Sequence, residues 1–146
     1  REVERKLVDA VKEGRSYGGV AEIVVLGLPK ALGQPVFHKL KADLAAAYMG
    51  VGAAIGVEIG SGFSAAGSEG TEFHRGDVGD YGGIRGGLST GEPLTARIVF
   101  KPTSTVMDLA KRGRHDPCIV PRALPVLEAM TWLVLCDHLL WRRLDR

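Results

Sequence analysis

The segment LTARIVF, Leu94–Phe100, decides the fold. Its positions alternate between two sets of side chains: Leu94, Ala96, Ile98 and Phe100 against Thr95, Arg97 and Val99. Because successive side chains of a β-strand point to opposite faces, this alternation predicts a strand that turns one face toward a core.

Two other segments are predicted to be strands. Residues 21–28, AEIVVLGL, are rich in β-branched side chains, which indicates a mostly buried strand. Residues 55–59, IGVEI, predict a shorter one. Residues 60–90 show no clear period of a helix or strand, so we expect mostly loop there, and residues 101–121 predict a basic loop. A loop as long as the first is usually functional or partly disordered.

Three segments have the spacing of a helix. Residues 1–13 place one apolar stripe opposite charged residues. The stripe consists of Val3, Leu7, Ala10 and Val11. Residues 36–49 repeat apolar side chains at helical spacing after a proline. Residues 125–144 are apolar on all sides between Trp132 and Cys136, which predicts a helix buried in a core, by another layer or another subunit.

The order of these segments predicts a single α+β domain, residues 1–146, with helices packed on one face of a mostly antiparallel sheet. This length suits one domain with its own core. No G-x-G-x-x-G motif lies between a strand and a helix, which argues against a dinucleotide-binding fold. The chain opens with Arg1 and not with Met, so we expect a processed, truncated or partly observed chain.

The composition argues against two classes of partner. The formal net charge is only +2 and aromatic residues make up 6%, which disfavours a nucleic-acid-binding surface. The longest stretch without a charge, residues 44–57, is shorter than the roughly 18–20 residues that span a bilayer. We therefore expect no membrane span, and the cysteine usage described next favours a reduced, cytoplasmic setting.

The potential metal ligands have no metal-site spacing. The two cysteines, Cys118 and Cys136, lie apart, and we expect them to be reduced, although one disulfide stays open as an alternative. The histidines His38, His74 and His138 are interpreted as surface or packing residues. Two acids in apolar surroundings, Glu58 and Glu128, are interpreted as buried, paired structural carboxylates.

Glycine is the outlier, with 20 residues, about twice the usual share. Residues 82–87, GGIRGG, place two glycine pairs two residues apart. Such a turn exposes backbone N–H groups that can hold an anion or approach a flat ring. The alternative is a sharp β-turn or bulge before the Leu94 strand.

Two further segments carry candidate binding groups. Residues 101–105, KPTST, supply one ammonium and three hydroxyls directly after a strand, which suits a phosphate, while the alternative is an ordinary polar turn. Residues 111–118, KRGRHDPC, followed by Arg122, gather cations around Asp116. That carboxylate could act as a weak base or hydrogen-bond acceptor, and the alternative is a solvated basic loop. Cys118 as a nucleophile is less favoured.

Taken in order, five stretches resemble chorismate synthase. They are LGQPVFHKLKAD (residues 32–43), GVEIGSGF (56–63), GGIRGG (82–87), KPTST (101–105) and GRHDPCIVPRALPVLEAM (113–130). The last is similar to a specific C-terminal signature of that family. The resemblance covers nearly the whole chain but only the second part of the enzyme, and the N-terminal part is absent.

The resemblance implies a β-α-β sandwich, a homotetramer, and reduced FMN as cofactor. It implies an enzyme, a carbon–oxygen lyase of aromatic amino acid biosynthesis, which eliminates phosphate from 5-enolpyruvylshikimate-3-phosphate. It implies that Asp116 lies near the flavin ring and helps to move the proton at flavin N5. The implied FMN contacts are Gly52, Ala53, Gly86, Lys101, Pro102, Thr103, Ser104, Thr105 and Arg114. We expect Gly86, Lys101 and Arg114 to converge on one anionic cofactor.

The chain also departs from the family pattern. The GESHG-type and RxSARET-type motifs, which carry most substrate-binding arginines and both proposed catalytic histidines, are absent. The loops at residues 62–82 and 105–113 look shorter, and Gly79, Asp80 and Tyr81 stand where an asparagine is common. A non-catalytic flavin- or phosphate-binding remnant and a structural module that assembles through its apolar helix therefore stay open as alternatives.

Overall fold

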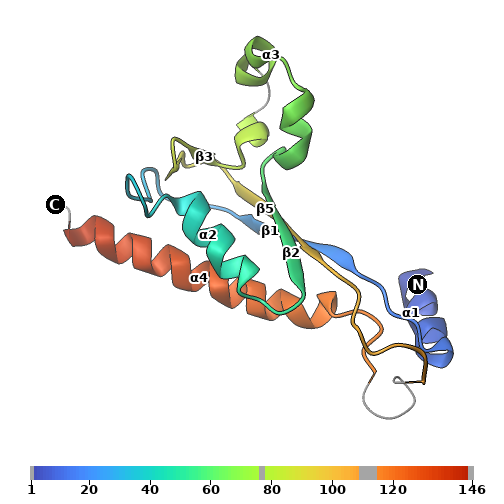
Figure 1. The fold of residues 1–146 in the computed structure, drawn as a ribbon. Helices are drawn as coiled ribbons and strands as arrows, with labels where there is room; N and C mark the ends of the chain where they lie inside the picture. The colour runs from blue at the N-terminus through green and yellow to red at the C-terminus, as the bar shows by residue number, and fades with distance from the viewer. Residues whose placement is uncertain (1, 76–77, 109–114, 145–146) are drawn as a thin grey trace.

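The computed structural model describes residues 2–75, 78–108 and 115–144 (Figure 1). Four helices, two 3-10 helices and five strands are assigned within them. In chain order these elements are α1 (Glu2–Glu13), β1 (Gly19–Val25), α2 (Leu40–Met49), β2 (Ala54–Ile59), η1 (Gly62–Gly67), α3 (Gly70–Arg75), η2 (Val78–Tyr81), β3 (Ile84–Arg85), β4 (Leu88–Ser89), β5 (Leu94–Phe100) and α4 (Val120–Leu144).

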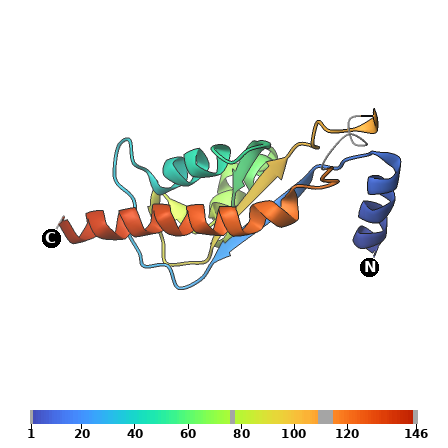
Figure 2. The same cartoon turned by 90° about the horizontal axis from the view of Figure 1, so that it is seen from below.

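The main sheet has the order β1-β5-β2, and both pairings are antiparallel. The central strand, β5, has the bounds that the sequence predicts, Leu94–Phe100. Every second side chain of β5 is at most 2% exposed: Leu94, Ala96, Ile98 and Phe100. Helices α2 and α4 lie along this face (Figure 2). The predicted α+β architecture, with helices on one face of an antiparallel sheet, is therefore confirmed.

The core joins the two helices as well as the sheet. From α2, the side chains of Leu40, Leu44 and Tyr48 are fully buried, and they meet Leu127 and other buried residues of α4. The Tyr48 hydroxyl is within 2.8 Å of Thr131 Oγ1, so one of these hydroxyls donates to the other. Thr131 in turn donates to the Leu127 carbonyl. This buried polar bridge fixes how α2 sits on α4.

Helix α4 differs from its prediction in two ways. It begins at Val120, five residues earlier than expected, with Pro125 inside it. Only one face is buried in this chain, because Trp132 is 57% and Leu133 63% exposed, whereas Leu135 and His138 are buried. The prediction that the centre of α4 is buried on all sides is therefore wrong for the chain on its own.

By length and composition α4 would also pass for a membrane-crossing helix. Such a helix is weak evidence when it stands alone, because core helices of soluble proteins meet the same criterion. Here α4 packs against α2 and β1. The interpretation of Glu128 as a buried acid is wrong, because it is exposed and lines a groove of about 350 Å³ between β1 and α4.

Helix α2 begins at Leu40, four residues later than predicted. The Leu40 N–H donates to the carbonyl of Gly87, at 2.8 Å, so the first turn of α2 is held by the β3–β4 hairpin. A Cβ at Gly87 would collide with the Lys39 side chain, and φ there is +91°, so both conditions favour glycine. The boundary is thus set by a contact about 47 residues away along the chain.

The region predicted to be mostly loop, residues 60–90, contains short elements. The 3-10 helices η1 and η2 and helix α3 form an arm that projects from the sheet, and β3 and β4 form a two-stranded hairpin (Figure 1). The first helix, α1, matches its prediction in extent, but of its expected stripe Val3 and Val11 are exposed and Ala10 is buried.

The histidine interpretation is confirmed for His138, which is a packing residue. Its Nε2 lies 3.0 Å from Asp43 Oδ2, and His38 Nδ1 lies 3.4 Å from the same oxygen. Both imidazole rings meet the Trp141 ring edge-on. The contact links α2 to α4 a second time.

Alkaline pH should reveal the buried Tyr48–Thr131 bridge. Burial raises the pKa of Tyr48 above its ordinary value of 10.0, so the folded state holds the neutral phenol. The stability that Tyr48 contributes is present below pH 10 and falls as pH rises through 10 toward the folded pKa, because the unfolded phenol ionises first. Tyr48→Phe should cost about 1 kcal/mol at pH 7, and this difference should shrink above pH 10. Urea unfolding of both proteins at pH 7 and at pH 10.5 measures this difference in the free energy of unfolding.

Tyr17→Phe is the matched control for this experiment, because Tyr17 lies near the surface. Its stability should run parallel to that of the unmodified chain at every pH. A Tyr48→Phe deficit that stays constant from pH 7 to pH 10.5 would contradict the assignment.

Candidate functional site

The predicted binding residues divide between the two ends of β5. The hairpin lies at the Leu94 end, where the Thr95 N–H donates to the Gly82 carbonyl. Lys101 follows Phe100 at the other end. A seven-residue strand separates them by roughly 20 Å at 3.3 Å per residue. The prediction that Gly86 and Lys101 meet at one corner of this chain is therefore wrong.

The glycine hairpin here has a structural role that the sequence left open. Gly86 and Gly87 form its two-residue turn with φ of +61° and +91°, as a tight hairpin requires. The Arg85 guanidinium lies 4.1 Å from the centre of the Tyr81 ring. A Cβ at Gly86 would meet nothing within 4 Å, so this side of the turn is open. That Gly86 contacts a ligand stays a prediction.

The other end of the sheet brings three predicted residues together. The Lys101 N–H donates to the Ala53 carbonyl at 3.0 Å. Ala53 has φ of +68°, a conformation that a residue with a side chain seldom adopts. A Cβ at Gly52 would meet nothing within 4 Å, so this turn has an open side. The turn at residues 52–53 and the start of the KPTST loop thus form one corner.

The segment at residues 14–17 holds the loops of this corner in place. One loop begins with the KPTST segment and contains Thr103 and Met107, and the other contains His115 and Pro117. Each of the four consecutive residues forms a hydrogen bond with one of these two loops. Met107 N–H donates to the Gly14 carbonyl, His115 Nε2 donates to the Arg15 carbonyl, the Ser16 hydroxyl donates to the Thr103 carbonyl, and Tyr17 N–H donates to the Pro117 carbonyl. No motif marks this segment in the sequence, so its role was not predicted.

The hydroxyls of the KPTST loop have different roles. Thr103 Oγ1 donates to the Asp116 carbonyl at 2.9 Å, so this hydroxyl joins the two loops. In the part of the chain that the structure describes, the hydroxyls of Ser104 and Thr105 have no hydrogen-bond partner. These two, with the exposed Lys101 ammonium, are the groups that remain available to an anion.

Asp116 is held in a fixed orientation. Its Oδ1 accepts the Cys118 N–H at 3.2 Å, and its Oδ2 lies 3.1 Å from Arg122 Nε. Both carboxylate oxygens therefore have cationic or N–H partners. Beside it, His115 Nδ1 is buried without a partner among the described residues. Arg114 lies outside the described residues, so its predicted place in this corner stays a prediction.

The donor set fits an anionic flavin cofactor. Lys101 offers a positive charge, Ser104 and Thr105 offer hydroxyls, and the turn at residues 52–53 offers backbone beside open space. The orphaned His115 Nδ1 adds a buried polar atom nearby. No three side chains of His, Cys, Asp or Glu gather as metal ligands within residues 2–75, 78–108 and 115–144.

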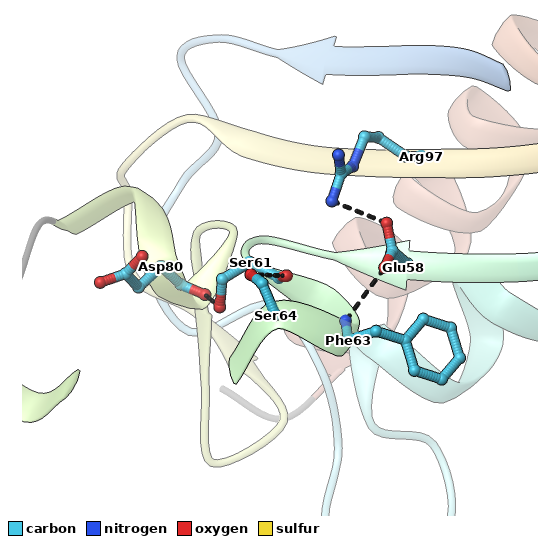
Figure 3. Close-up of polar contacts among 6 residues, drawn as sticks. All are labelled: Glu58, Ser61, Phe63, Ser64, Asp80 and Arg97. Carbon is cyan, nitrogen blue, oxygen red and sulfur yellow. Dashed lines mark hydrogen bonds and ion pairs between the residues drawn. The ribbon is translucent and has the colours of Figure 1, made fainter. Parts of the chain in front are cut away.

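A second polar cluster lies on the sheet itself (Figure 3). Glu58 Oε2 is 2.7 Å from Arg97 Nη2, and Glu58 Oε1 accepts the Phe63 N–H at 3.0 Å. The predicted pairing of Glu58 is confirmed, but the residue is partly buried and not fully buried. Arg97 was not predicted as its partner, although the strand register makes the two direct neighbours. Ser61 donates to the Asp80 carbonyl nearby, which fastens the arm.

Comparisons with known proteins agree with the motifs. A model of the chorismate synthase family matches residues 1–140. The chorismate synthase of Bdellovibrio bacteriovorus is 61% identical over 146 residues, which are all of this chain and 43% of that protein. That of Methanothermobacter thermautotrophicus is 46% identical, over 96% of this chain and 44% of its own length. The chain thus spans less than half the length of these curated relatives.

A solved structure and the lengths of the two alignments bear on the fold and on the loop lengths of this chain. A crystal structure of chorismate synthase is similar with a TM-score of 0.80 and 34% identity, over 97% of this chain and 43% of that one. The Methanothermobacter alignment runs to 165 positions for 96% of a 146-residue chain, so that relative has extra residues within the matched region. The Bdellovibrio alignment, at 146 positions, needs none.

The extra residues of the Methanothermobacter relative are consistent with the prediction that loops of this chain are shorter than is common in the family. The Bdellovibrio relative aligns without extra residues, so these loop lengths do not argue against membership of the family. With the family model matching nearly the whole chain, and motifs, fold and relatives in agreement, the chain belongs to the chorismate synthase family.

Proposed function

We propose that this chain forms the C-terminal part of a chorismate synthase and supplies one side of its reduced FMN site. The reaction is the anti-1,4-elimination of phosphate from 5-enolpyruvylshikimate-3-phosphate to give chorismate. The observation that carries the proposal is the corner where the turn at residues 52–53, the KPTST loop and Asp116 are joined by hydrogen bonds.

The chain's own residues would bind and orient the cofactor. Lys101 and the hydroxyls of Ser104 and Thr105 would hold a phosphate or the anionic flavin, since charge-assisted hydrogen bonds are the strongest available here. Pro102 stiffens the loop between Lys101 and Thr103. The turn of Gly52 and Ala53 would let the backbone approach the ring. Reduced flavin, when bound, supplies the electron density that the elimination needs.

Asp116 would act at the flavin ring. The Cys118 N–H and Arg122 hold its carboxylate in one orientation, as a group that moves a proton at flavin N5 requires. Arg114, two residues before it, would add a cation at the same corner. Gly86 belongs to the family pattern too, but any contact it makes with FMN must come from the opposite end of this sheet.

The activity requires more than this chain. The motifs that carry most substrate-binding arginines and both proposed catalytic histidines are not in its sequence. We propose that the remaining part of the family fold contributes them, that it covers the exposed face of α4, and that the complete protein is a cytoplasmic homotetramer. A remnant that binds flavin without turnover is the second candidate, supported by the same corner and the same missing motifs.

Replacing the lysine of the corner should weaken flavin binding. Lys101→Gln removes the charge but keeps the backbone N–H that bonds Ala53. We expect the dissociation constant for FMN to rise by about tenfold or more, since hydrogen bonds to charged groups contribute about 1.5–3 kcal/mol. Titration of flavin absorbance measures it. Lys41→Gln, an exposed lysine of α2, is the control, and equal affinities in both variants would remove Lys101 from the site.

Replacing Asp116 should separate binding from chemistry. In a protein that carries the rest of the family fold, Asp116→Asn should leave FMN affinity nearly unchanged but slow elimination by about 10²-fold or more, the lower range of general acid–base effects. Stopped-flow turnover with reduced FMN measures this. Arg122→Gln, which removes the carboxylate's ion-pair partner, should cost much less. An equal loss in both variants would indicate that Asp116 acts only by holding the loop.

A further inference from the structure

The chain on both sides of Asp116 is tied to one segment that lies far away in the sequence. On the side before it, His115 Nε2 lies 2.8 Å from the Arg15 carbonyl, across 100 positions of sequence. On the side after it, the Pro117 carbonyl accepts the Tyr17 N–H at 2.8 Å. Asp116 therefore sits between two anchors, and the same short segment supplies the partner of each.

The anchor before Asp116 depends on a side chain. A carbonyl oxygen can only accept a hydrogen bond, so His115 Nε2 must carry the hydrogen and donate it to Arg15. The bond thus selects the neutral tautomer in which Nδ1 carries no hydrogen. Nδ1 is buried and has no partner among the described residues, so within them the ring is held by its bond to Arg15.

The other contacts of Asp116 orient it but do less to place it in the corner. The Cys118 N–H that donates to Oδ1 comes from two residues along the same loop and moves with that loop. Arg122 is 71% exposed, and an ion pair so open to water is weak. The Thr103 hydroxyl joins the loop to another loop, not to the body of the fold. His115, in contrast, fixes the loop against the segment that leads into β1.

We propose that His115 is a positioning residue for Asp116, which it holds in place through the Nε2–H bond to the Arg15 carbonyl. The inference rests on the role proposed for Asp116 and assigns His115 no contact with flavin or substrate. A small displacement of a reacting group costs up to about 10²-fold in rate. Loss of this bond should therefore slow the elimination while the cofactor, held by other groups, stays bound.

A matched pair of amide variants isolates the bond. In His115→Gln the amide nitrogen lies about as far along the side chain as imidazole Nε2 does, so it can still donate to the Arg15 carbonyl. In His115→Asn the amide nitrogen lies near the position of Nδ1, too far from that carbonyl. Both replacements are neutral and polar, so the two variants differ chiefly in whether this bond forms.

Two measurements on the chain need no cofactor. Long-range nitrogen–proton NMR at about pH 8, where an ordinary imidazole is neutral, should place the hydrogen of the His115 ring on Nε2. The Cys118 amide reports on the Asp116 carboxylate to which it donates. Its hydrogen exchange should be about fivefold faster in His115→Asn and unchanged in His115→Gln, as for the loss of one neutral hydrogen bond. A hydrogen on Nδ1, or equal exchange in the two variants, overturns the proposal.

Kinetics tests whether the effect passes through Asp116. In a protein that carries the rest of the family fold, His115→Asn should lower kcat by about tenfold or more, with KM and FMN affinity nearly unchanged. His115→Gln should keep most of the rate. Combined with Asp116→Asn, the His115→Asn change should cost little more, because residues that act as a unit are not additive. Losses that multiply in the double variant, or weakened FMN binding, contradict a positioning role.

The results also separate this inference from the proposed function. If Asp116→Asn turns over normally, the role proposed for Asp116 fails, while the ring tautomer and the Cys118 amide still decide whether His115 holds residue 116 in place. If Asp116→Asn is slow and His115→Asn is not, the proposed function stands and this inference is wrong. Circular dichroism checks folding. Should His115→Asn not fold, His115→Ser, which is also too short to reach Arg15, replaces it with the same expected results.

Discussion

The burial of one face of β5 is the interaction on which the described structure depends. Leu94, Ile98 and Phe100, which this strand removes from water, each contribute roughly 1.5–3 kcal/mol. A register shift by one residue in β1 or β2 would turn an apolar set away from α2 and α4, so the same burial fixes the register of both neighbours. The polar loops at the strand ends and the Glu58–Arg97 ion pair take their positions from that register.

This dependence separates the candidate functions in space. The end of β5 at Phe100 leads into the corner with Lys101 and Asp116, and the end at Leu94 receives the glycine hairpin that starts α2. Between them, Arg97 of β5 forms an ion pair with Glu58 of β2. A change at one of these places is therefore about 10 Å or more from the others, and its effects should be largely additive.

Sequence reasoning succeeded where one local pattern decides the outcome. The alternation in Leu94–Phe100 predicted the strand with its bounds. The KPTST segment and the segment at Asp116, which were expected to converge, are joined by a hydrogen bond from Thr103. Sequence reasoning failed where a distant contact decides. The start of α2 depends on the Gly87 carbonyl, and the partner of Glu58 depends on strand register. The apolar residues around Trp132 show which surface of the helix can be buried. They do not show whether this chain itself supplies the residues that pack against that surface. The prediction that Gly86 and Lys101 meet was wrong because the motifs that they share with the family do not show at which end of a strand each motif lies.

The segment at residues 14–17 ties the cofactor corner together by bonds that alternate between its two loops. Because consecutive residues serve different loops, neither loop can leave without disturbing the backbone that holds the other. We therefore expect this segment and the described parts of the two loops to open as one cooperative unit, with amides that exchange with solvent together. Affinity for a ligand at this corner is consequently linked to the order of a four-residue segment that need not contact the ligand at all.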